Sequence, residues 1–261
     1  MFVNMGTPML FVVLVVIMFG SSVAGIVVGR RRHTAEGGHD SVGVVQGTLL
    51  GLVGLLLAFG LTMSVGRYEA RRALVVQEAN DIGTTYLRAQ MLSEPARTTS
   101  LDLLQEYADL AIDLADQVPD TDRFDADKAR LGALQRDLWT AAGVALEADS
   151  QGTAPRLYIE TLNNTIDTNS ERLASLGNKV PTTVMFLQVA GSAIALAVLA
   201  LYLSLLGRGF TTSLVAAGVV TLIVFVSFDL DRPQRGLITV PFGPLEDVRA
   251  LMDDPPAIPA P

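Results

Sequence analysis

A short, strongly charged segment stands directly after an uncharged stretch of the chain. It reads Arg67-Tyr68-Glu69-Ala70-Arg71-Arg72. On a continuous helix Arg67 and Arg71 share a face, and Glu69 reaches Arg72 three positions on. Arginines at the end of an apolar segment raise the local concentration of small anions, but arginine and tyrosine are also common anchors at a membrane interface. Both interpretations stay open, and we name residues 67–72 the basic collar.

Acidic residues near the other end of the chain are the second candidate for chemistry. Asp229 and Asp231 follow the last uncharged stretch, and carboxylate oxygens suit a divalent cation. Two carboxylates alone are weak evidence for a metal site, so ion pairs with Arg232 or Arg235 are the favoured interpretation. We expect no metal site and no cofactor.

Nucleophilic and redox chemistry have little support in this sequence. The chain has no cysteine, which excludes thiolate catalysis and iron–sulfur sites. Its two histidines, His33 and His39, fall in one expected loop, so a histidine-rich metal centre is not expected either. No uncharged stretch combines serine with histidine or holds two aspartates, and we therefore expect no enzyme activity. A net charge of −8 also opposes binding to nucleic acid.

The candidate residues are positioned by four long stretches without aspartate, glutamate, lysine or arginine. Half of all residues are hydrophobic and 18% are charged, whereas soluble domains carry about 25% charged residues. A helix of about 20 apolar residues crosses a bilayer. We therefore predict that the chain is embedded in a lipid bilayer through four transmembrane helices. The stretches are 1–29, 41–66, 180–207 and 209–228, with helices expected over approximately 9–28, 44–65, 181–206 and 210–228.

The polar side chains inside these stretches are mostly hydroxyls and amides. Active transporters of protons or ions usually need an ionisable side chain inside the membrane, and tyrosine is the only such residue type here. A passive pore remains allowed, because it selects ions with backbone groups, hydroxyls and apolar constrictions. The candidate residues for a pore or for helix packing are Thr62, Ser64, Gln188 and Ser192. Each of them also suits a buried hydrogen bond between helices.

Glycines recur every four residues in the second stretch, at Gly43, Gly47 and Gly51. On a helix they form a stripe without side chains, which permits close backbone contact between helices in lipid. We expect this stripe to line a pore or to join copies of the chain into a homo-oligomer. Glycine is also common in transmembrane helices that have no such role.

The uncharged stretches also predict the domain organisation. Residues 1–66 hold the first two transmembrane helices and a short basic loop, and residues 180–228 hold a transmembrane hairpin. The tail, residues 229–261, is polar and rich in proline, and we expect its last part, 253–261, to be disordered.

The segment between the two transmembrane parts, residues 67–179, is acidic overall. Its apolar residues repeat at helical spacing, for example Leu101, Leu104 and Ala108. This spacing predicts a bundle of about four helices, the first of which continues the second transmembrane helix.

The arginines do not place this bundle on one side of the membrane. Short cytoplasmic loops tend to be positive, and the short loops here carry Arg30, Arg31, Arg32 and Arg208, which favours an external bundle. The basic collar lies on the bundle side of the second transmembrane helix and favours the opposite arrangement. Both arrangements stay open.

Several motifs of the chain resemble the bacterial membrane family called bestrophin-like. They are Leu52-Val53-Gly54-Leu55-Leu56-Leu57-Ala58-Phe59, the basic collar, Ala79-Asn80-Asp81-Ile82, and Asp229-Leu230-Asp231-Arg232-Pro233 with Gly236 after the last span. Together they cover nearly the whole chain. That family is in turn distantly similar to bestrophins, which are pentameric anion channels with four spans and a helical insertion between the second and third. The segment that follows the second span in bestrophins is matched in part by Tyr68, Glu69, Arg71 and Arg72.

The resemblance implies an all-α integral membrane protein with a helical bundle inserted between transmembrane helices 2 and 3. It implies a multi-pass homo-oligomer of the bacterial inner membrane that conducts small anions passively. The alternative is a sensory or scaffolding membrane protein that conducts nothing and binds a partner through its acidic bundle.

Overall fold

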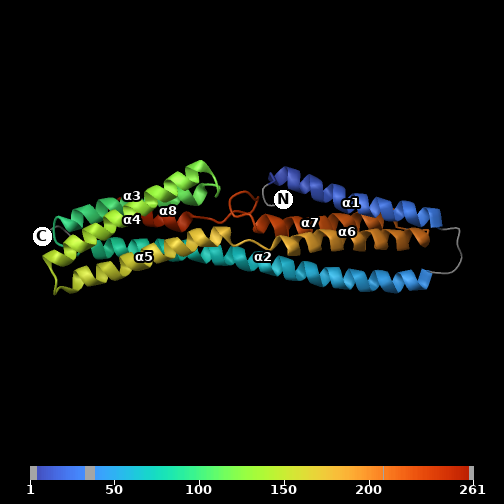
Figure 1. Ribbon diagram of the computed structural model, residues 1–261, viewed down its shortest axis with the longest axis horizontal. Helices are drawn as coiled ribbons and strands as arrows, with labels where there is room; N and C mark the ends of the chain where they lie inside the picture. The colour runs from blue at the N-terminus through green and yellow to red at the C-terminus, as the bar shows by residue number, and fades with distance from the viewer. Residues whose placement is uncertain (1–4, 33–38, 208, 259–261) are drawn as a thin grey trace. The chain divides into compact units, whose positions relative to one another are not determined.

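The chain is all helical over the residues that the structure describes, as predicted (Figure 1). The computed structural model describes residues 5–32, 39–207 and 209–258, and of residues 32 and 39–41 the backbone alone. His33 and Arg208 therefore lie outside the described residues, as does the side chain of His39. The helices are α1 (Thr7–Arg32), α2 (His39–Ala89), α3 (Ala96–Asp116), α4 (Asp122–Ala148), α5 (Thr153–Gly177), α6 (Thr182–Leu205), α7 (Phe210–Leu230) and α8 (Gly243–Leu251).

Two compact units make up the fold. The first unit consists of Met1–Tyr68 and Lys179–Thr239, and so contains α1, α6, α7 and the first part of α2. The second unit consists of Glu69–Asn178 and Val240–Pro261, with the rest of α2 and with α3, α4, α5 and α8. Helix α2 is continuous, so the second transmembrane helix does extend into the segment that follows it.

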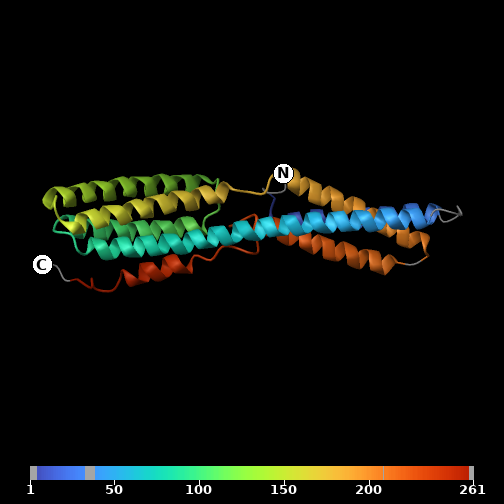
Figure 2. The ribbon, with the colours of Figure 1, turned by 90° about the horizontal axis from the view of Figure 1, so that it is seen from below.

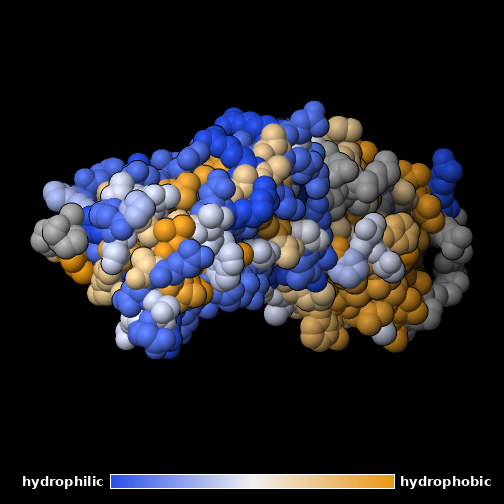
Figure 3. Space-filling model, turned by 60° about the vertical axis from the view of Figure 1, so that its left-hand side comes forward, coloured by the Kyte–Doolittle hydropathy of each residue, from blue (hydrophilic) through white to orange (hydrophobic). Residues whose placement is uncertain are grey.

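The first unit has the character of a membrane protein. Helices α1, α2, α6 and α7 are long and apolar enough to cross a membrane, as predicted. Their surface is apolar as well, with Val12, Val16, Phe186 and Val215 all exposed (Figure 3). A surface of this kind is unfavourable in water and suits the hydrocarbon core of a bilayer.

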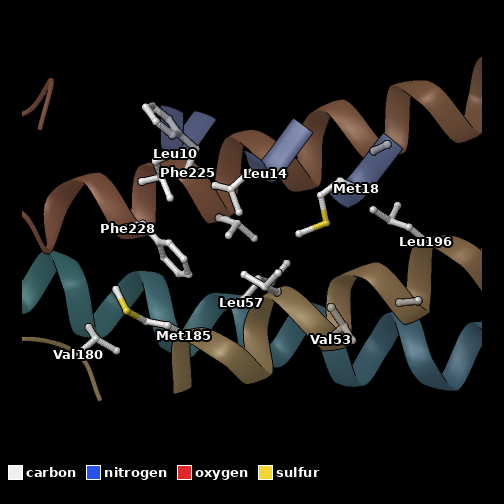
Figure 4. Packing of buried hydrophobic residues seen from close by; sticks show 14 residues of the cluster. Leu10, Leu14, Met18, Val53, Leu57, Val180, Met185, Leu196, Phe225 and Phe228 are labelled. Carbon is white, nitrogen blue, oxygen red and sulfur yellow. The ribbon is translucent and has the colours of Figure 1, made fainter. Parts of the chain in front are cut away.

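The core of the first unit consists of apolar side chains from all four of its helices. On α1, Leu10, Leu14 and Met18 follow one another at intervals of four residues and point into this core (Figure 4). The rings of Phe11 and Phe225 meet edge to face with 5.2 Å between their centroids. Helix α1 is therefore fixed to α7 by interlocking side chains.

Two glycines of α1 let α6 approach very closely. A Cβ on Gly25 would lie 2.1 Å from the backbone oxygen of Ala197, and a Cβ on Gly29 would lie 2.7 Å from the Cβ of Ser204. The Ser204 hydroxyl also donates a hydrogen bond of 3.2 Å to the backbone oxygen of Ile26. This glycine pair has the four-residue spacing typical of tight helix contacts in membranes.

The second unit is a helical bundle with its own core. Helices α3, α4 and α5 lie beside the last part of α2 (Figure 2). Each helix contributes fully buried leucine or isoleucine side chains, and these side chains account for much of the hydrophobic stabilisation. They are Ile82 of α2, Leu104 and Leu114 of α3, Leu131 and Leu138 of α4, and Leu162 of α5.

A polar network crosses the centre of this bundle. Glu78 of α2 forms an ion pair with Arg172 of α5, and the two side chains are 0% and 3% exposed. The Asn169 amide donates to Glu78 over 2.7 Å, and the Gln135 amide donates to Asn169 over 3.2 Å. Burial and the nearby Glu78 carboxylate raise the pKa of Tyr107, the fifth member of the network. The network therefore joins side chains from all four helices.

The C-terminal tail packs on the second unit. Helix α8 contacts α3, and beyond it Ile258 donates its backbone N–H to Gln90 over 3.2 Å. The Arg97 guanidinium donates to the backbone oxygen of Ile258 over 2.6 Å. The expectation of disorder is therefore wrong for residues 253–258, because the side chains of Gln90 and Arg97 bind the backbone of this segment. Residues 259–261 lie outside the described residues.

Candidate functional site

Helix α2 is the least covered of the transmembrane helices. In its most apolar window 11% of the residues are buried, compared with 28% for α1 and 44% for α7. Its buried residues within the first unit form one stripe, which half-buried residues such as Leu49 and Leu50 flank, and the opposite side of the helix is exposed. The stripe consists of Val53, Leu57, Gly60 and Ser64. A helix this open in one copy of the chain is the natural candidate for contacts outside it.

The three glycines of the predicted stripe do not share one environment. A Cβ on Gly43 would lie 3.1 Å from the ring of Tyr202, so this glycine faces another helix of its own unit. Gly47 and Gly51 are exposed, and among the described residues nothing lies within 4 Å of a Cβ built on either. Only the latter two are available to another molecule.

The four polar candidates, two on α2 and two on α6, divide between exposed and buried positions. Thr62 is exposed, and its hydroxyl donates to the backbone oxygen of Ala58 over 2.9 Å. Ser64, Gln188 and Ser192 are buried inside the first unit. Thr62 alone of the four thus lies on the surface that α2 leaves open.

Gly60 and Gln188 meet where α2 contacts α6. A Cβ on Gly60 would lie 1.5 Å from Nε2 of Gln188 and 2.6 Å from its Cδ, so the amide occupies the space of the missing side chain. Gly60 is not a member of the predicted stripe. The sequence shows that Gly60 lies three residues after Leu57 and four before Ser64. It does not show that the Gln188 amide fills the space of the missing side chain.

The basic collar is divided between exposed and buried positions. Glu69 and Arg72 are exposed and form the predicted pair, with 3.9 Å between the charged atoms. Arg67 and Tyr68 are half-buried. Arg71 is buried, and its guanidinium donates to the backbone oxygens at the end of α5, over 3.3 Å to Ser175 and 2.8 Å to Asn178.

The position of Arg71 gives it a structural role. The last carbonyls of a helix have no partner within the helix and carry partial negative charge, which a cation stabilises. Arg71 therefore secures the C-terminus of α5. Its charge is not part of the exposed surface to which Arg72 belongs.

Asp229 and Asp231 are buried and bind backbone N–H groups. Asp229 Oδ2 accepts from Leu237 over 2.7 Å and from Ile238 over 2.9 Å. The Asp231 carboxylate accepts from Val180 over 2.9 Å and 3.1 Å. Backbone N–H groups thus supply hydrogen bonds that burial demands. The favoured pairing with Arg232 or Arg235 stays a prediction, which the electrostatic attraction between Asp229 and Arg232 supports.

Arg232 completes this group of residues at the end of α7. Its guanidinium donates to the backbone oxygen of Met5, ahead of α1. Burial lowers the pKa of Arg232, while the neighbouring Asp229 carboxylate opposes that shift. We name Asp229, Asp231 and Arg232 the α7-end cluster. Among the described residues no three acidic or histidine side chains form a metal site.

Comparison with known proteins gives two matches. The family model described as a bestrophin-like domain matches residues 9–245. A solved structure of a mutant bacterial bestrophin homolog from Klebsiella pneumoniae is similar with a TM-score of 0.66 and 13% sequence identity. That likeness covers 93% of this chain and 97% of the other. The search of curated proteins finds no match.

Proposed function

The chain belongs to the bestrophin-like family, and from this premise we propose that it forms a passive anion pore around α2 in a bacterial inner membrane. Several copies of the chain surround one pore, and each copy contributes the exposed face of its α2. The observation that carries this proposal is the low coverage of α2, of whose most apolar window 11% is buried.

The residues on the open face of α2 fit both assembly and conduction. Gly47 and Gly51 leave room for a neighbouring backbone, and the face adds a hydroxyl at Thr62. Neither the face nor the rest of this transmembrane helix carries an ionised side chain. Such a lining permits passive flow of ions and offers no ionisable group that could couple this flow to proton binding.

The charges of the basic collar favour anions over cations. Arg72 is exposed and is only weakly engaged by Glu69 at 3.9 Å. Arg67 and Arg72 together outnumber Glu69, so every copy of the chain adds net positive charge near the pore entrance, which attracts small anions and repels cations. Arg71 contributes to the fold instead.

Chloride efflux from liposomes tests the proposed activity. Liposomes that contain the purified protein should release chloride faster than protein-free liposomes, because a passive pore needs no energy source. An ion-selective electrode measures the release. Equal rates, with the oligomer shown intact by gel filtration, would contradict the proposal and favour a scaffolding role.

Replacing Gly47 by leucine should weaken assembly. The new side chain would stand where a neighbouring backbone approaches, while among the described residues of the same copy nothing lies within 4 Å of its Cβ. We expect multi-angle light scattering to show smaller particles in mild detergent. The matched control is Gly20→Leu on α1, another glycine whose Cβ would meet no described atom within 4 Å. Unchanged particle mass for Gly47→Leu would show that this face does not join copies.

A further inference from the structure

Among the described glycines of α2, Gly60 makes the closest contact with α6. The buried stripe of α2 includes Val53 and Leu57, whose side chains pack in the core of the first unit (Figure 4). At Gly60 the contact is much closer, since a Cβ there would lie 1.5 Å from Nε2 of Gln188. The two helices can therefore approach no further than the Gln188 amide allows.

Gly191, a second glycine at the contact between α2 and α6, has more room than Gly60. A Cβ on Gly191 of α6 would lie 3.5 Å from Cγ2 of Val53, an ordinary van der Waals contact. At Gly60, in contrast, any side chain must displace the Gln188 amide or move α2. Gln188 is 1% exposed, so its amide has no open solvent to move into.

We propose that Gln188, acting through the space left by Gly60, is a positioning residue that sets the width of the pore. This inference rests on the proposed function, in which the open face of α2 lines the pore. The buried stripe that contacts α6 lies on the opposite side of α2 from that open face. Any increase in the α2–α6 distance therefore moves α2 towards the pore axis.

Two features make the pore sensitive to this contact. First, α2 has little other coverage within the first unit, so few contacts resist its displacement. Second, every copy in a symmetric assembly shifts in the same way, so a small displacement narrows the pore from all sides. Within the described residues Nε2 of Gln188 has no hydrogen-bond partner. Truncation of Gln188 therefore removes volume without breaking a hydrogen bond of that nitrogen.

Single-channel recording of variants in planar bilayers tests the inference. Gly60→Ala should lower the unitary conductance at least about twofold, because α2 moves towards the pore axis and narrows the pore. Gln188→Ala should raise it, and the double variant should return close to the wild-type value. Gly191→Ala is the matched control and should leave it unchanged, because its Cβ fits. Unitary conductance does not depend on how many channels fold, so a general loss of stability would not mimic these shifts.

The outcomes separate this inference from the proposed function. A wild-type protein that conducts, with Gly60→Ala and Gln188→Ala both at the wild-type unitary conductance, overturns the role of Gln188 and leaves the pore intact. A silent wild-type protein overturns the pore itself. If Gly60→Ala fails to assemble, the other two variants decide: raised conductance for Gln188→Ala and recovery in the double variant support the inference, and unchanged conductance for Gln188→Ala refutes it.

Discussion

Replacing Arg172 by methionine should lower the free energy of unfolding of the second unit by about 3–5 kcal/mol, the cost of breaking a buried ion pair from one side. The substitution leaves the Glu78 carboxylate without its counter-ion at a site that is 0% exposed. Among the described residues, the Asn169 amide would remain as the hydrogen-bond donor to a charge that water cannot reach. Chemical unfolding of the detergent-solubilised full chain measures the loss, and the single tryptophan, Trp139 of α4, reports on this unit.

A second arginine of the same unit provides the control. Arg130 pairs with Glu106 across exposed side chains, 60% and 45% accessible, so Arg130→Met should change the unfolding midpoint little. The double variant Glu78→Leu with Arg172→Met should recover much of the lost stability, because an apolar pair of similar volume needs no counter-ion. If Arg172→Met and Arg130→Met have equal effects, the buried pair has no special role in stability.

Replacing Gly25 by alanine should destabilise the first unit by about 1–3 kcal/mol, the range for overpacking a close contact. The added Cβ would lie 2.1 Å from the backbone oxygen of Ala197, and a backbone atom cannot rotate away as a side chain can. Helices α1 and α6 must therefore separate, which loosens the contact at Gly29 as well. The thermal-unfolding midpoint of the full chain, followed by circular dichroism in detergent, measures the effect.

The control is the equivalent substitution at Gly20, on the same helix. Nothing described lies within 4 Å of a Cβ at that position, and alanine favours the helix over glycine by about 1 kcal/mol. Gly20→Ala should therefore leave the midpoint unchanged or raise it. A Gly25→Ala protein as heat-resistant as Gly20→Ala would mean that α1 and α6 are not closely packed.

The transmembrane helices were predictable because ionised residues are excluded from them over long continuous stretches. Helix α1 begins at Thr7 and α7 begins at Phe210, close to the predicted positions 9 and 210. The glycine pattern was less informative. Gly25 and Gly29 have the same spacing as Gly47 and Gly51, and no sequence pattern says which of these pairs faces a helix of the same chain.

The buried polar residues could not be assigned from the sequence. Glu78 and Arg71 are ordinary charged residues in a segment full of charges, and their burial follows from tertiary packing alone. The same holds for Asp229, whose partners are backbone N–H groups that every residue except proline possesses. A charged side chain can be counted from the sequence, but its environment depends on helices that lie far away along the chain.

The α7-end cluster has a consequence for the order of events during synthesis. It joins the end of the last transmembrane helix to Met5, to Val180 and to residues 237–238. None of these bonds can form before the ribosome has added α7, even though Met5 is synthesised well before it. The first unit is therefore completed only after α7 has been made, and a nascent chain halted before residue 232 would hold α1 in the bilayer without this attachment.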